Sequence, residues 1–205
     1  MKNKLQILII GVILFASCEK QEPVYRLTYD FEPDQETIIE IDVVPVGDVV
    51  LEKEDMLMEV NADYYNRYGI GIELNFLDRI QLSDEGKFRG VENRVTVYVV
   101  EQSLIQLRRA SSGYTIRYTG TINKSVIVIG ESSQRNAVLA HEIGHAYGLH
   151  HVELENNLME KWVSASQYNV PHDLVGSQVD SILTETKGNH KLSLETKHAV
   201  EIFID

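Results

Sequence analysis

Residues 141–151 read His141-Glu142-Ile143-Gly144-His145-Ala146-Tyr147-Gly148-Leu149-His150-His151 and contain four of the chain's seven histidines. His141 and His145 are four residues apart, so on a helix both imidazoles leave the same face and can bind one ion. Glu142 stands beside them and can reach a water bound to that ion. The pattern therefore predicts a metal site on a helix.

Gly148 follows the second histidine by three residues. A glycine at this point can adopt a positive φ, end the helix and turn the chain back. Such a turn would bring His151 up as a third ligand. Three nitrogen ligands with a fourth position open are typical of a catalytic zinc site, whereas structural sites are closed.

The whole pattern, H-E-x-x-H-x-x-G-x-x-H, resembles the signature of the metzincin zinc metalloproteases. The resemblance implies one catalytic Zn²⁺ on His141, His145 and His151. It also implies that Glu142 is the catalytic general base. His150 lies one position before the third ligand, and we expect its side chain to point elsewhere.

The resemblance further implies a methionine in a tight turn beneath the metal. Met159, eight residues after His151, is the candidate for this Met-turn, although a buried methionine is also a common filler of cores. The short interval, with Leu158 before the methionine, resembles the matrixin branch. In the family, the segment after this turn walls the pocket for the residue that follows the cleaved bond, which here implies 161–168.

Several features differ from related families. All seven histidines lie at or after position 141, so the second, structural zinc that matrixins hold with upstream histidines cannot be built in the same way. The single cysteine excludes a cysteine-rich second site and a cysteine-switch propeptide. Lys161 occupies the place where astacins and serralysins carry a tyrosine. Calcium stays open, because no loop shows the spaced carboxylates of an EF-hand.

The hydrophobic pattern of the remaining chain predicts a layered α/β fold. Strands are expected at 37–46, 70–77, 95–100, 114–118 and 125–130, and helices at 50–68 and 134–147, with Ser132 or Ser133 as the cap of the second helix. A weaker helical signal covers 178–186 and a better one covers 193–203.

Together these features predict a zincin-like, metzincin-like fold. It comprises a twisted, mostly parallel five-stranded sheet with an antiparallel edge strand, the active-site helix, and a small irregular or helical C-terminal subdomain. The polar alternation of Tyr114–Tyr118 favours that segment as the edge strand along which an extended peptide would bind, although an ordinary hairpin strand is equally compatible.

The N-terminus predicts export. Lys2 and Lys4 precede about a dozen mostly apolar residues, a layout typical of a secretory signal peptide. The ending Leu14-Phe15-Ala16-Ser17-Cys18 resembles a bacterial lipobox, which implies lipidation of Cys18. A plain signal peptide with a chance cysteine is the alternative. The expected location is the bacterial cell envelope, with a lipid anchor at Cys18, or secretion if the lipobox interpretation is wrong.

The sequence therefore predicts one catalytic domain of ordinary size that follows a signal peptide and a tether. Residues 1–17 form the signal peptide and residues 18–36 form the lipidated cysteine with a tether. The catalytic domain then spans 37–205, divided into an N-terminal subdomain (37–148) and a C-terminal subdomain (149–205).

The charge balance restricts the partners. The chain has 19 Lys and Arg against 31 Asp and Glu, a formal charge of −12, which argues against nucleic acid because phosphate binding needs a basic surface. We therefore expect a peptide or protein substrate, membrane contact only through the lipid anchor, and a monomer by default.

The predicted function is a zinc metalloendopeptidase. One alternative is a surface lipoprotein that uses the zinc-bearing scaffold to bind a partner without turnover. Another is a zinc-storage protein, which the open three-histidine site disfavours.

Overall fold

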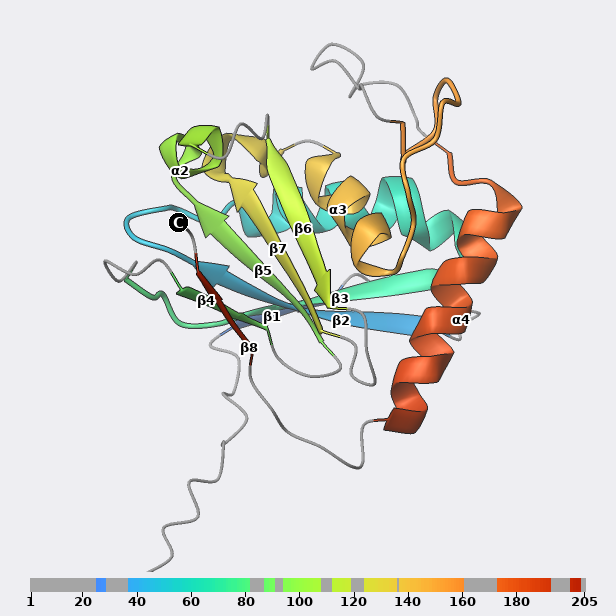
Figure 1. Cartoon of the computed structure of the whole chain (residues 1–205), viewed down its shortest axis with the longest axis horizontal. Coiled ribbons are helices and arrows are strands. Elements are labelled where there is room, and N and C mark those ends of the chain that lie inside the picture. The colour runs from blue at the N-terminus through green and yellow to red at the C-terminus, as the bar shows by residue number, and fades with distance from the viewer. Residues whose placement is uncertain are drawn as a thin grey trace, which may run out of the picture.

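The structure is a computed structural model that describes residues 25–28, 37–81, 87–90, 94–107, 112–118, 124–135, 137–160, 173–192 and 200–203. A central sheet of six strands carries helices on one face (Figure 1). Its strands are β1 (Tyr25–Thr28), β2 (Thr37–Pro45), β3 (Ile70–Phe76), β5 (Val95–Val100), β6 (Gly113–Tyr118) and β7 (Lys124–Gly130).

The strand order is β1-β3-β2-β5-β7-β6. The four inner strands run parallel to one another, and the two edge strands β1 and β6 are antiparallel to their neighbours. The predicted fold is confirmed, including Tyr114–Tyr118 as an antiparallel edge. The sheet has one strand more than expected, because β1 forms inside the segment 18–36 that was predicted to be a tether.

The buried inner strands explain the apolar runs in the sequence. All six residues of β5 are buried, and both faces of the sheet carry a hydrophobic cluster. Strands covered on both faces read as continuous hydrophobic segments in place of a clean alternation. This is why the pattern of the inner strands is so easily recognised.

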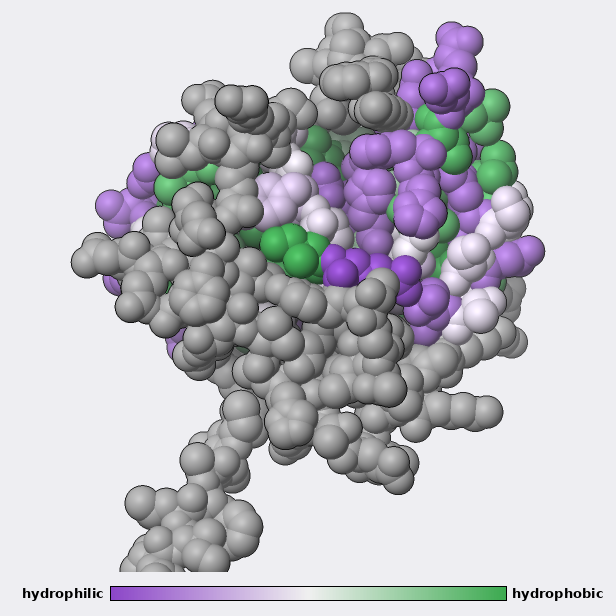
Figure 2. All heavy atoms as spheres, in the orientation of Figure 1, coloured by the Kyte–Doolittle hydropathy of each residue, from purple (hydrophilic) through white to green (hydrophobic). Residues whose placement is uncertain are grey.

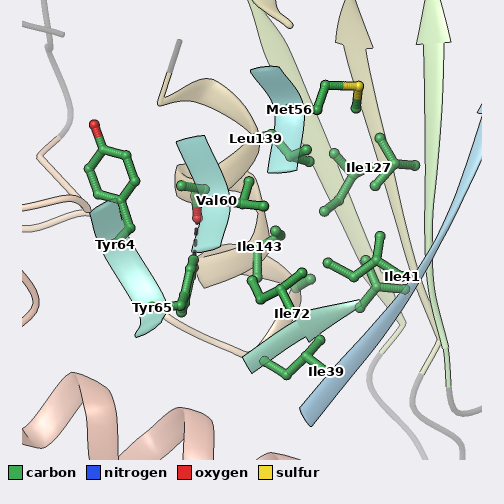
Figure 3. Close-up of a cluster of buried hydrophobic side chains, with 14 of the residues drawn as sticks. Ile39, Ile41, Met56, Val60, Tyr64, Tyr65, Ile72, Ile127, Leu139 and Ile143 are labelled. Carbon is green, nitrogen blue, oxygen red and sulfur yellow. Dashed lines mark hydrogen bonds between the residues drawn. The ribbon is translucent and has the colours of Figure 1, made fainter. Parts of the chain in front are cut away.

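The expected helix at 50–68 is present but irregular. It consists of α1 (Lys53–Leu57), the π-helical stretch η1 (Met58–Tyr65) and one 3₁₀ turn, η2 (Asn66–Tyr68). Figure 3 shows Val60 of η1 packing with Ile143 of the active-site helix and with isoleucines of β2 and β3. Packing within this cluster sets the distance between the predicted active-site helix and the sheet.

The active-site helix α3 (Val138–Ala146) follows the 3₁₀ turn η3 (Glu131–Ser133). Its N-cap is Ala137, without a side-chain hydrogen bond, so the predicted cap at Ser132 or Ser133 is wrong. The side chains of Leu139 and Ile143 are buried in the larger hydrophobic cluster. The Tyr65 hydroxyl donates a 2.7 Å hydrogen bond to the Ala140 carbonyl (Figure 3).

The C-terminal part contains a long helix, α4 (Gly176–Leu192), at the place of the weak signal over 178–186. The predicted helix at 193–203 is wrong over its described end, because β8 (Val200–Phe203) is a strand. It pairs with β4 (Lys87–Gly90) in a small separate sheet. The C-terminal subdomain is therefore not purely helical or irregular. A further helix, α2 (Gln102–Leu107), was not predicted.

Several predictions concern residues outside the described ones. They are the signal peptide, Cys18, the tether outside β1 and the pocket-wall segment 161–168. Within the described part, no helix has the length and apolar character needed to cross a membrane. Figure 2 shows mainly hydrophilic and neutral residues over α3 and α4 on this face, with hydrophobic ones scattered among them.

Candidate active site

The end of α3 sets the geometry of the metal-site histidines. Gly148 has φ 88°, and the Gly148 and Leu149 amides donate to the His145 and Gly144 carbonyls at 2.9 and 3.0 Å. This pair of bonds is the Schellman arrangement that closes a helix at a glycine. The chain then reverses, as the sequence predicts, and returns His151 toward the helix.

Hydrogen bonds to carbonyl oxygens set the tautomers of the two helical histidines. His141 Nδ1 lies 2.6 Å from the Leu158 carbonyl oxygen, and His145 Nδ1 lies 2.8 Å from that of Leu149. A carbonyl can only accept, so each Nδ1 carries the proton and each neutral ring presents the lone pair of Nε2. Burial lowers the pKa of His145, which favours the neutral form that binds metals.

The three Nε2 atoms converge on one point. His151 Nε2 lies 3.2 Å from His141 Nε2 and 3.1 Å from His145 Nε2. A tetrahedral zinc with Zn–N bonds of about 2.0–2.1 Å separates its nitrogens by about 3.4 Å. The donor set therefore fits a zinc ion. Among the described residues, these three histidines form the one cluster of potential metal ligands, and the exposed His150 does not belong to it.

Glu142 stands beside this cluster with a side chain that is only 6% exposed. Burial raises the pKa of Glu142 to about 7, and a hydrogen bond from Thr115 opposes that rise. The Thr115 hydroxyl lies 2.5 Å from Glu142 Oε2. Thr115 comes from the edge strand β6, which the sequence favoured as the substrate edge, but nothing in the sequence paired Thr115 with Glu142.

Met159 is fully buried beneath α3. A Cβ atom on Gly144 would overlap the Met159 sulfur, so the glycine between the two histidines permits the close approach of this turn. Asn156 has φ 61°, a left-handed conformation that asparagine adopts more readily than most residues. The structure thus places Met159 in a tight turn directly against the active-site helix.

The buried side chain of Asn157 ties the Met-turn to α4. Asn157 Nδ2 donates to Gln178 Oε1 at 2.9 Å, and Gln178 Nε2 donates back to Asn157 Oδ1 at 3.1 Å. Asn157 Oδ1 also accepts the Met159 amide, and Gln178 Oε1 accepts the Val175 amide. Sequence reasoning missed Gln178, because an amide in a weakly amphipathic helix carries no signal of its own.

Residues 26–179 match the family model of the matrixins. The chain belongs to the matrixin family. Membership supports a zinc metalloprotease, a hydrolase of peptide bonds, and the family implies that zinc is the metal for the three histidines. The predicted resemblance to the matrixin branch of the metzincins is therefore confirmed.

Among solved structures, this matrixin is similar to the crystal structure of metalloproteinase-II from Bacteroides fragilis, with a TM-score of 0.54 and 16% sequence identity. The alignment covers 82% of this chain and 56% of that chain, so the matrixin matches little more than half of the larger protein. At this identity the likeness concerns the fold. No protein of curated function matches the sequence.

Proposed function

We propose that this matrixin is a zinc-dependent endopeptidase that cleaves internal bonds of extended peptides or proteins, with Glu142 as general base. The observation that carries the proposal is a buried carboxylate next to three converging imidazole nitrogens. His141, His145 and His151 would hold the single zinc, and the ion would polarise the scissile carbonyl and acidify a water.

Glu142 supports this reaction through its environment. Burial raises the pKa of its carboxyl group, which makes Glu142 a stronger base than an exposed glutamate. The carboxylate can accept a proton from the attacking water. It can then return that proton to the leaving amine.

The substrate is proposed to add to the sheet along β6. Among the described residues this strand pairs with β7 alone, so its outer edge can offer backbone groups to an extended peptide. Thr115 of the same strand already reaches Glu142, so a peptide on this edge passes the carboxylate. An antiparallel peptide would lie with its N-terminal half beside Arg117–Tyr118 and its C-terminal half beside Gly113–Tyr114.

An unbiased peptide library tests the proposed activity. We expect cleavage at internal bonds by protein that contains about one zinc per chain, and loss of cleavage after chelation. Purified protein that holds zinc but cleaves no peptide would favour a partner-binding scaffold. A higher zinc stoichiometry without cleavage would favour storage.

We also propose that the mature protein is anchored in a bacterial envelope through lipidated Cys18. The support is the sequence Leu14-Phe15-Ala16-Ser17-Cys18 after a short apolar segment. Metabolic labelling with a radioactive fatty acid should mark the wild-type protein and not the Cys18→Ala variant. Equal labelling of both proteins would refute the anchor.

A further inference from the structure

The Thr115 hydroxyl sits between two oxygen atoms of the same glutamate. Thr115 Oγ1 lies 2.5 Å from Glu142 Oε2 and 3.0 Å from the Glu142 backbone carbonyl oxygen. A hydroxyl has one proton to donate and two lone pairs that accept. It therefore cannot donate fully to both oxygens at once, and the shorter distance makes Oε2 its principal acceptor.

Both protonation states of Glu142 can be satisfied at this position. When Glu142 is a carboxylate, Thr115 donates its proton to Oε2. When Glu142 carries a proton on Oε1, Oε2 is the carbonyl oxygen of the carboxyl group and still accepts from Thr115. The hydroxyl and the heavy atoms keep their positions in both states.

The edge strand is held firmly at this point. Two residues before Thr115, the strand approaches α3 closely. A Cβ atom on Gly113 would lie 3.0 Å from the Val138 side chain of that helix. Two residues after Thr115, Arg117 covers Gly148 and forms a 3.0 Å ion pair with Glu185 of α4. Packing on both sides therefore fixes Thr115 relative to Glu142.

From this geometry we propose that Thr115 is a positioning residue for catalysis. It keeps the Glu142 carboxyl group in one orientation throughout the cycle, donating to Oε2 both before water attack and while Oε1 carries the proton that passes to the leaving amine. Oε2 is then engaged with Thr115, and Oε1 is left to exchange the proton with the reacting groups. The inference rests on the proposed role of Glu142.

The test compares zinc-loaded Thr115→Val, Thr115→Ala and Thr115→Ser with wild type, using a fluorogenic peptide selected from the library. Loss of orientation by a catalytic group costs up to about 100-fold in rate. We expect Val and Ala each to lower kcat by about 10- to 100-fold with KM changed by less than about threefold, because the hydroxyl contacts Glu142 and not the substrate. Serine keeps the hydroxyl and should stay within about threefold of wild-type kcat.

Thr96→Val is the matched control. Thr96 is a buried threonine of β5 whose hydroxyl has no hydrogen-bond partner in the part of the chain that the structure describes, so its removal should leave kcat unchanged. Zinc content and melting temperature are measured for every variant. A Glu142→Asp background gives a second readout: shortening the acid by one methylene should draw its carboxylate away from Thr115, so Thr115→Val should cause little further loss there.

Three results would overturn the inference: near wild-type kcat in both the Val and Ala variants, a serine variant as slow as valine, or a loss confined to KM. Failure of the proposed function looks different. In that case zinc-loaded Glu142→Ala would itself retain cleavage, whatever the Thr115 variants do.

Discussion

At the scale of single residues, the burial of Glu142 costs stability when its side chain is charged. Burial raises its pKa from 4.5 to about 7 in the metal-free protein. The folded state therefore binds this proton more tightly than the unfolded state does. The resulting stabilisation of the fold is present below about pH 4.5 and is lost as the pH rises through 7. At alkaline pH the fold therefore contains an unfavourable buried charge.

Glu142→Gln should remove this penalty. In the presence of a chelator at pH 8, we expect the variant to unfold with a free energy higher than wild type by at most about 3 kcal/mol. The gain should shrink toward zero near pH 4.5, where both side chains are neutral. Urea denaturation at both pH values measures it, and an equal difference at the two values would contradict the account.

Gly144 is a second residue whose identity has a steric reason. Gly144→Ala would place a Cβ atom against the fully buried Met159 sulfur, and overpacking of this kind costs about 1–3 kcal/mol. Thermal denaturation should show the loss. Gly176→Ala is the control, because nothing lies within 4 Å of its Cβ position, and a comparable loss in that variant would argue against the steric explanation.

The convergence of His141, His145 and His151 could be predicted from the sequence because their spacing is local: four residues on a helix and one glycine turn. Thr115 could not, since it reaches Glu142 from a strand 27 positions earlier in the chain. No periodicity connects the two, and only the packing of β6 against α3 brings them together.

At the scale of elements, α4 holds the Met-turn in place. The Leu158 carbonyl that orients His141 belongs to this turn, and the Asn157–Gln178 amide pair fixes the turn to the start of α4. The Leu158 amide donates to the backbone carbonyl of Asp173, which lies just before α4 begins. The helix therefore supports the metal site without supplying a ligand.

Gln178→Leu should reveal this support. The variant leaves the Asn157 amide and the Val175 N–H without their partner, and an unsatisfied buried polar group costs about 1–3 kcal/mol. We expect that loss in stability together with faster zinc release to a chelator. Ser181→Ala, at an exposed site on the same helix, is the control and should change neither property. Unaltered zinc release in Gln178→Leu would show that the Met-turn keeps its position without the contact to α4.

The elements that sequence reasoning identified are those with strong local patterns, such as the buried inner strands and α3. The missed ones are short and depend on distant partners. β4 has only four residues, Lys87–Gly90, and its pairing partner β8 lies more than 100 positions away. The pattern over 193–203 favoured a helix. A local pattern carries no information about pairing with a strand so distant in the chain.

At the scale of the whole molecule, the sheet is the frame on which the active site is assembled. One face carries α3 and η1 over the larger hydrophobic cluster, and the edge strand β6 runs beside α3 (Figure 1). The three histidines, the proposed general base and the proposed substrate strand thus come from adjoining parts of one packed unit. Arg117 adds a link from this edge to α4 through Glu185.

We propose that this assembly hydrolyses peptides with zinc on three histidines and Glu142 as base. Peptide cleavage by Glu142→Ala, measured beside its zinc content, tests that claim. We expect about one zinc per chain, as in wild type, and a fall in kcat/KM of about 100-fold or more. A zinc-loaded Glu142→Ala variant that cleaves within about threefold of wild type would contradict the claim.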